Sequence, residues 1–214
     1  MTPQRTPKLD RKLVAETALT LLNEVGLEGL TLRAIARELD VKAPALYWHF
    51  KDKQALLDEM ATEMMRRMRL GTVRPEGDWR EAFRATMRAL REHLLRYRDG
   101  AKVYSGTRFT DTSYAEGLEA SLRMLTEAGF TQAAAARAWF TACSYTIGFV
   151  IEEQAVGPNP FEGTEGYDVD ARAERLAAYP LAAQAGREMF QDFDRGFEKG
   201  LDAVLAGIEA TLSS

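Results

Sequence analysis

Apolar residues recur at helical spacing along nearly the whole chain, and no stretch alternates as a half-buried strand would. The first apolar stripe consists of Val14, Ala18, Leu21, Leu22 and Val25. Asp10 precedes this stripe and Gly26 follows it, and both are residue types that cap helix ends. The pattern predicts an all-α protein of nine or ten helices.

Short helical segments with defined ends follow between residues 31 and 64. Thr31 can cap a second helix, and Asp40 stands where the chain must then turn sharply. Pro44 suits the first turn of a third helix, while Asp52 can cap a fourth that runs through Met64. This order predicts an N-terminal three-helix domain that contains a helix-turn-helix.

Glycine and proline interrupt the helical pattern twice in the rest of the chain. Residues 71–78 predict a domain boundary or hinge, and residues 157–170 predict a long loop. The expected organisation is a DNA-binding domain over residues 1–54, a connecting helix and hinge over 55–74, and a larger helical domain over 75–214. Further helices are expected over residues 79–96, 113–128, 131–154, 171–178 and 183–212.

The composition is that of a globular protein. The chain has 214 residues, 46% of them apolar and 28% charged, with a net charge of −4. Residues 1–70 hold 12 Lys and Arg against 10 Asp and Glu, and the remainder holds 16 against 22. This asymmetry fits an N-terminal DNA contact, although an ordinary solvated surface would also produce it.

The N-terminus lacks the apolar core of a signal peptide, and Cys143 is the single cysteine. The most apolar stretch, residues 133–151, carries polar groups in its middle, which favours a buried helix over a membrane span. A cytoplasmic location is therefore expected. Two histidines, one cysteine and no metal-ligand spacing leave little for catalysis, so neither an enzyme nor a metal or cofactor site is expected.

The third predicted helix carries the side chains expected of an element that lies in a DNA groove. Ala43 and Ala45 are small and let the backbone approach base edges closely, while Tyr47 can bond phosphate oxygens. Lys53, in the first turn of the next helix, can reach a phosphate, and Arg33 can reach a guanine edge or a phosphate. The alternative is that Tyr47 and the adjacent tryptophan belong to the core.

Several runs at these positions resemble the TetR family of bacterial transcriptional regulators. They are ALTLLNEVG at 18–26, EGLT at 28–31, LYWH at 46–49 and KQALLD at 53–58. Further runs, RDGAKV at 98–103, GTR at 106–108 and IGFVIEEQ at 147–154, resemble its tetracycline-repressor subgroup. The resemblance covers about three quarters of the chain. It implies a ligand-responsive regulator, a repressor rather than an activator.

The resemblance also implies which residues contact the DNA operator. They are Thr31, Arg33, Lys42, Ala43, Pro44, Ala45, Tyr47, Trp48, His49 and Lys53. Ala43 and Ala45 replace polar side chains that read bases in the subgroup, and Lys42 replaces an acidic residue. The operator sequence is therefore expected to differ from that of the subgroup.

The implied effector pocket departs further from the subgroup, whose members hold their drug as a magnesium chelate through a histidine and, by way of water, a glutamate. Tyr104 stands at the histidine position, and a neutral phenol is a poor ligand for Mg²⁺. The implied effector-binding residues are Arg69, Thr86, Leu90, Tyr104, Thr107, Arg108, Ser121, Ser144 and Glu152. Leu90 and Ser144 could equally be packing residues. A small organic effector with a few oxygens is expected, without a response to tetracycline and Mg²⁺.

A homodimer on a palindromic operator, with half-sites about 34–36 Å apart, is the expected assembly. Its interface is expected from helix 131–154 and from an apolar stripe on the last helix, which could instead be intrachain core. The stripe consists of Leu201, Val204, Leu205, Ile208 and Leu212. One alternative is a DNA-binding protein controlled by a partner or by no effector. Another, a ligand carrier without DNA contact, would need the face of Tyr47 to Lys53 packed away from solvent.

Overall fold

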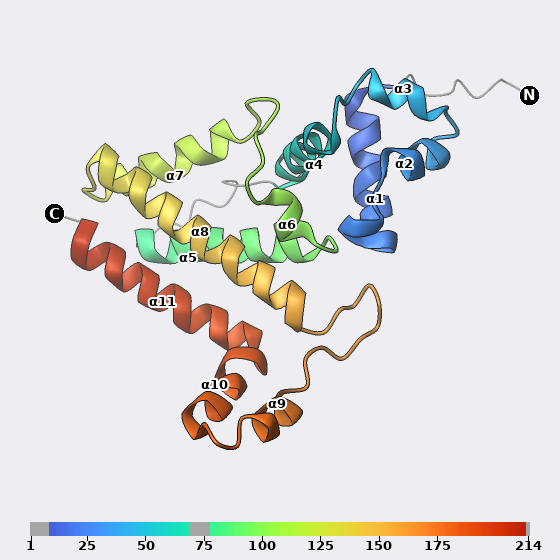
Figure 1. The fold of residues 1–214 in the computed structure, drawn as a ribbon. Coiled ribbons are helices and arrows are strands. Elements are labelled where there is room, and N and C mark those ends of the chain that lie inside the picture. Colours follow the sequence, from blue (N-terminus) through green and yellow to red (C-terminus); the bar gives the residue numbers. More distant parts are fainter. Residues whose placement is uncertain (1–8, 69–77, 213–214) are drawn as a thin grey trace, which may run out of the picture.

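The computed structural model describes residues 9–68 and 78–212, and within them the chain is helical, without a strand. Eleven helices form where nine or ten were predicted (Figure 1). The short helix α6 (Gly100–Tyr104) was missed, and the predicted last helix is divided into α10 (Pro180–Phe190) and α11 (Phe193–Leu212). The division has a local cause, because the Asp192 side chain accepts a hydrogen bond from the amide of Arg195 and starts a new helix.

The head of the molecule consists of α1 (Arg11–Gly29), α2 (Leu32–Glu38) and α3 (Ala43–Tyr47). Asp10 and Thr31 cap α1 and α2 as predicted, accepting from the amides of Leu13 and Ala34 at 2.8 and 3.1 Å. Asp40 takes the left-handed conformation at the turn, with φ of 53°. These three local features hold α3 across the end of α1 and α2.

The connecting helix α4 (Lys53–Arg67) leads from the head into the body and begins at the predicted cap Asp52. It packs against α1 of the head and α6 of the body. The predicted break at 71–78 lies outside the described residues apart from Asp78, which caps α5 (Trp79–Leu95). The helix α4 therefore lies between the head and the body and contacts both (Figure 1).

The body is built around the long helix α8 (Gln132–Val156). It packs against α5, α6, α7 (Ala115–Glu127) and α11. The loop predicted over 157–170 runs from the end of α8 to α9 (Val169–Arg175), which packs on α10. Figure 1 shows α8 crossing α5, with α11 and α10 at the far side of the body from the head.

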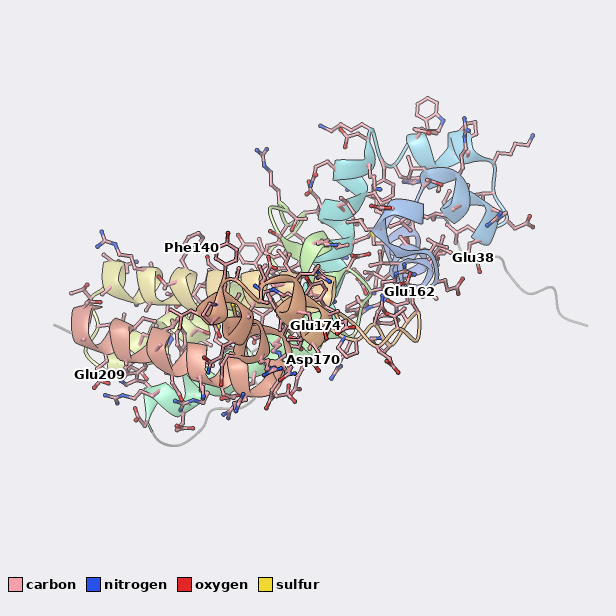
Figure 2. The ribbon with its side chains drawn as sticks, turned by 60° about the horizontal axis from the view of Figure 1, so that its bottom comes forward. Glu38, Phe140, Glu162, Asp170, Glu174 and Glu209 are labelled. Carbon is pink, nitrogen blue, oxygen red and sulfur yellow. The ribbon has the colours of Figure 1, made fainter. Side chains whose placement is uncertain are left out.

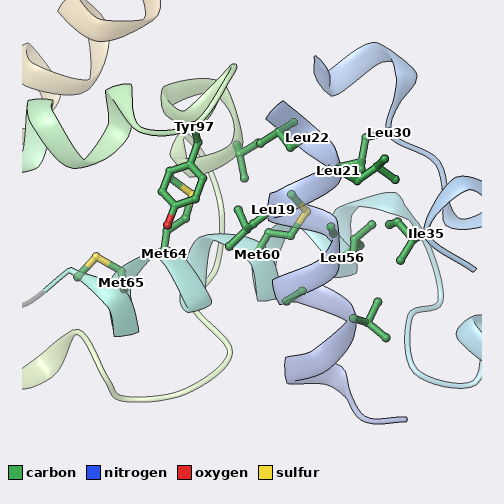
Figure 3. Packing of buried hydrophobic residues seen from close by; sticks show 14 of the residues in the cluster. Leu19, Leu21, Leu22, Leu30, Ile35, Leu56, Met60, Met64, Met65 and Tyr97 are labelled. Carbon is green, nitrogen blue, oxygen red and sulfur yellow. The ribbon is translucent and has the colours of Figure 1, made fainter. Parts of the chain in front are cut away.

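Two apolar clusters form the core. The first joins the head to α4 and α6, and Figure 3 shows Leu19 and Leu22 of α1 beside Met60 and Met64 of α4. The second lies between α5, α8 and α11 and includes Phe83 and Phe197. Leu201, Leu205 and Ile208 of α11 belong to this second cluster, with 0, 3 and 3% of their surface exposed. The last-helix stripe is therefore intrachain core at these positions rather than dimer interface.

Candidate nucleic-acid interface and ligand pocket

The helix α3 presents aromatic side chains to solvent. Leu46 and Phe50 are fully buried and anchor the helix in the head, whereas Tyr47 is 54% and Trp48 89% exposed. The expectation that Tyr47 and Trp48 could be core residues is thus wrong. The face from Tyr47 to Lys53 is exposed to solvent. A ligand carrier without DNA contact would need this face to be packed away from solvent, so that alternative is not supported.

The other residues expected at the DNA surround this face. Exposed positions are Thr31, Arg33, Lys42, Pro44 and Lys53, and half-buried positions are Ala43, Ala45 and His49. They come from the first turn of α2, from α3 with the residues that flank it, and from the first turn of α4. Within the described residues, neither Arg33 nor Lys42 makes an ion pair, so both cations face solvent. Cations from α2 and from the start of α3 therefore lie on the same face of the head as the exposed aromatic side chains at the end of α3.

Lys53 has a neighbour that the sequence did not reveal. Its ammonium donates a hydrogen bond to the carbonyl oxygen of Leu27 at 2.8 Å. The amide of Leu27 in turn donates to the carboxylate of Asp99 at 3.0 Å, and Asp99 precedes α6 of the body. This contact contributes to a pKa of Asp99 below its ordinary value: burial opposes the shift, and the Leu27 amide and Lys102 outweigh it. The backbone of Leu27 thus links Lys53 to Asp99 of the body.

The buried carboxylates of Glu59 and Glu63 on α4 form a second junction between head and body, with Glu59 at its centre. Glu59 accepts from the guanidinium of Arg11 at 2.9 Å, and Arg11 also donates to the carbonyl oxygen of His49 at 2.6 Å. Glu59 accepts in addition from the hydroxyl of Thr110 at 3.0 Å. The side chain of Glu59 is only 5% exposed. A single buried carboxylate therefore touches α1 of the head and the loop that follows α6.

Arg66 extends this junction. It pairs with Glu59 and Glu63 at 3.2 Å and with Asp111 at 2.6 Å. Hydrogen bonds from Ser113 and Arg66 lower the pKa of Asp111 to about 2, against a small opposing effect of burial. Although burial of Arg66 disfavours its charge, its carboxylate partners hold its pKa above the ordinary value. Residues 107–113 are consequently tied to α4 by charge.

A cavity of about 350 Å³ lies in the body against this loop. Its lining contains Met65, Thr86, Met87, Leu90, Tyr104, Thr107, Phe109, Tyr114, Leu118, Trp139, Phe140, Cys143, Ser144 and Ile147. Burial raises the pKa of Cys143 to about 12 and that of Tyr104 above its ordinary value, so both remain protonated. Figure 2 shows Phe140 at the surface of the body, where 73% of its side chain is exposed, so the cavity reaches that surface.

Five of the nine expected effector residues line this cavity, namely Thr86, Leu90, Tyr104, Thr107 and Ser144. The other described ones do not line it. Arg108 and Glu152 are exposed, and the hydroxyl of Ser121 donates to the carbonyl of Gly117 within its own helix. Arg69 lies outside the described residues. The lining also contains four residues of α8 that were not predicted, Trp139, Phe140, Cys143 and Ile147, although their spacing with Ser144 marks one face of this helix.

Rings from three chain segments form one wall of the cavity. The centroids of Tyr104 and Phe109 are 5.7 Å apart, edge to face, and those of Phe109 and Tyr114 are 5.1 Å apart and stacked. The hydroxyl of Tyr104 donates to the sulfur of Met65 at 3.0 Å. No group of three or more His, Cys, Asp or Glu side chains suited to a metal ion occurs among the described residues. In the same part of the chain, no helix is long and apolar enough to cross a membrane.

Comparison with known proteins agrees with both halves of this arrangement. The family model of bacterial regulatory proteins of the tetR family matches residues 14–60, and that of the tetracyclin repressor-like C-terminal domain matches residues 73–212. The class A tetracycline repressor from transposon 1721 of Escherichia coli is 40% identical over 204 residues, which cover 94% of this chain and 91% of that protein.

Solved structures resemble the whole chain as well. A possible TetR family regulator from Streptomyces coelicolor is 37% identical with a TM-score of 0.80, covering 94% of this chain and 99% of that one. A TetR variant from Acinetobacter baumannii in complex with minocycline is 34% identical with a TM-score of 0.72, covering 97% and 100%. With an exposed aromatic face on the head, a pocket in the body and these relatives, the chain belongs to the TetR family of bacterial transcriptional regulators.

Proposed function

We propose that this protein is a transcriptional repressor that binds a palindromic operator as a homodimer and leaves it when a small organic molecule enters the pocket. The observation that carries the proposal is that α4 contacts both the head, which presents the exposed end of α3, and the cavity in the body, which Met65 of α4 lines. An enzymatic role is not proposed, because the cavity lining holds no base beside a nucleophile. A cytoplasmic location follows from the proposed contact with DNA.

The DNA-facing role rests on the ten residues named above, with Tyr47 and Lys53 as phosphate ligands and Ala43 and Ala45 against base edges. Phosphate contacts fix the position of α3, and the alanines leave room for the helix to enter the major groove. Because both alanines are half-buried and carry no hydrogen-bonding group, sequence would be recognised largely through Arg33 and Lys42. The division into residues 1–54, 55–74 and 75–214 belongs to the same proposal.

Regulation would use the contacts of α4. A ligand in the cavity touches Met65 of α4 and Thr107 in the loop after α6. The same loop holds α4 through Thr110 and Asp111, and α4 holds the head through Glu59 and Arg11. A ligand that binds one orientation of α4 more tightly than the other would increase the population of that orientation. The distance between the two heads of the dimer would change with it. A DNA-binding protein without an effector would have no use for a cavity so largely apolar.

Dimerisation would use the outer faces of α8 and α11. Several of the exposed residues there are small, namely Gly148, Ala203, Ala206, Gly207 and Ala210. A methyl group added to Gly148 or Gly207 would meet no atom of its own chain within 4 Å. Small side chains let helices of two protomers approach closely, and a two-fold axis through these faces would present both heads to one DNA site.

The DNA-binding role can be tested with an operator selected from random DNA by the purified protein. Tyr47→Ala and Lys53→Ala should each weaken operator binding at least tenfold, measured by fluorescence anisotropy. Lys53→Ala should also reduce the slope of log affinity against log salt by about 0.9, the effect of one lost phosphate contact.

The matched control is Lys12→Ala, which removes an exposed lysine of α1 paired with Glu16 at 3.9 Å. It should leave the operator affinity within twofold of the original. Unchanged affinity in both Tyr47→Ala and Lys53→Ala would contradict the assignment of the interface.

A further inference from the structure

We propose that the effector is an uncharged, planar aromatic molecule whose carbonyl oxygen accepts a hydrogen bond from Tyr104, bound without a metal ion. This inference rests on the proposed function and narrows it to a chemical class. Three features of the cavity carry it: the lack of charge in its lining, the weak partner of the Tyr104 hydroxyl, and the aromatic wall.

The lining excludes charge. None of the described side chains around the cavity is Asp, Glu, Lys, Arg or His. Transfer of an ionised group from water into such surroundings is strongly unfavourable unless a counter-charge meets it, and it is far more unfavourable than transfer of a neutral polar group. Arg108 and Glu152, the nearest expected charges, are exposed and not part of the lining. The cavity therefore selects neutral molecules.

Tyr104 is a hydrogen-bond donor in this lining whose partner in the protein is a weak acceptor. The hydroxyls of Thr86 and Thr107 already donate to the carbonyl oxygens of Ala82 and Tyr104, at 2.9 and 2.8 Å. The Tyr104 hydroxyl donates only to the thioether sulfur of Met65, and sulfur of this kind is a weak acceptor. Burial raises the pKa of Tyr104, so the phenol stays a neutral donor. A ligand carbonyl is a stronger acceptor than the sulfur and would replace it.

The aromatic wall favours a flat ligand. The rings of Phe109 and Tyr114 are stacked at an interplanar angle of 30°, and Tyr104 meets Phe109 edge to face. Trp139 adds a further large ring to the lining, and Met65 and Met87 are polarisable and adapt to an irregular outline. Aromatic groups in such arrangements are stabilised beyond the burial of their surface.

A magnesium chelate does not fit this donor set. The resemblance to the tetracycline-repressor subgroup implies a metal-bound drug, and Tyr104 occupies the position of the metal's histidine. Mg²⁺ prefers carboxylates, water and phosphate oxygens. The described part of the lining contains no carboxylate, and the Tyr104 phenol would have to lose its proton against the effect of its burial. The hydrogen bond from Tyr104 to a ligand carbonyl uses the same position without a metal.

The test compares two flat, neutral probes that differ by one carbonyl oxygen, 9-fluorenone and fluorene. Binding to the full-length protein is measured by equilibrium dialysis, with magnesium chloride and with EDTA. The original protein should bind fluorenone about threefold to tenfold more tightly than fluorene, the size of one neutral hydrogen bond. Fluorenone-4-carboxylate, the charged analogue, should bind at least tenfold more weakly than fluorenone. Magnesium and EDTA should change neither affinity.

Tyr104→Phe should abolish or reverse the preference for fluorenone while leaving fluorene within twofold, because only the donor is lost. The matched control is Tyr114→Phe, which removes a hydroxyl from the neighbouring ring of the same wall and should keep the preference. Retention of fluorene binding shows that the variant cavity is intact. The inference is overturned if Tyr104→Phe keeps the preference, if the carboxylate binds as tightly as fluorenone, or if affinity requires magnesium.

Failure of this inference is separable from failure of the proposed function. Operator binding is measured on the same preparations without any probe. If operator binding persists while neither probe binds, the ligand class is wrong and the regulator remains. If operator binding is absent, the proposed function fails whatever the probes do.

Discussion

The Nε atom of Arg11 lies 2.9 Å from an oxygen of Glu59, and the same oxygen accepts the hydroxyl of Thr110 at 3.0 Å. Arg11 belongs to the head and Thr110 to the loop beside the cavity. The buried carboxylate of Glu59 thus holds two parts of the molecule that are far apart in sequence. Because the Glu59 carboxylate is nearly inaccessible to water, removing it should cost more stability than removing a surface ion pair.

Glu59→Ala should lower the free energy of unfolding by about 2 kcal/mol, the range for hydrogen bonds to a charged group. The cost stays below that of a fully buried pair because the Arg11 side chain is 42% exposed and can regain water. Guanidinium denaturation followed by circular dichroism at one protein concentration measures the change. Lys12→Ala, which breaks an exposed pair, should cost less than about 0.5 kcal/mol. Equal losses in the two variants would refute a structural role for the junction.

Asp111 should make stability fall in acid. Its pKa of about 2 in the folded protein lies below the usual value near 3.8, with Ser113 and Arg66 as causes. A lowered folded pKa contributes stability that is complete above about pH 4 and is lost as the pH falls toward 2. Asp111→Asn should therefore be less stable than the original at pH 7, and the difference should shrink as the pH falls from 4 to 2. Urea titrations at several pH values would reveal it, and a difference independent of pH would argue against the ion pair.

Gly207→Trp should break the dimer without unfolding the protomer. The position is exposed on α11, and a Cβ atom added there would meet no atom of its own chain within 4 Å. A bulky ring would keep apart two helices that small residues allow to approach. Sedimentation velocity should show a folded monomer of about half the mass, with the helical circular dichroism retained. Thr20→Trp places the same bulk on the exposed face of α1 and should remain dimeric.

Features fixed by local chemistry were predictable from sequence. The caps Asp10, Thr31 and Asp52 form the expected hydrogen bonds, because a short side-chain acceptor satisfies a free amide wherever a helix starts. Asp40 takes the left-handed turn for an equally local reason. The helix α6 was not predictable, since its five residues give no periodic pattern, and Asp99 before it is held by the distant amide of Leu27.

The cavity was predictable only in part. Tyr104 and Thr107 came from the resemblance, and both line the cavity. Periodicity identifies the faces of α8. It does not reveal which of these faces lines the cavity together with α4, α5 and the loop after α6. Ser121, for example, was expected in the pocket, but its hydroxyl donates to the carbonyl oxygen of Gly117 in its own helix. Two partners of Glu59, Arg11 and Thr110, lie 48 and 51 residues away along the chain, a separation that no local pattern reveals.

Lys53 enters its proposed encounter with DNA already constrained. Its ammonium is held by the carbonyl of Leu27, and the amide of Leu27 is held by Asp99 of the body. An ammonium has three donors, so one can stay on Leu27 while another meets a phosphate. Much of the rotational freedom of a long lysine chain, worth up to about 2 kcal/mol, is then lost on folding rather than on binding. If the head shifts against the body and the bond between Asp99 and Leu27 breaks, the Lys53 side chain would regain conformational freedom. It would then lose that freedom on binding a phosphate, so the phosphate contact would be weaker.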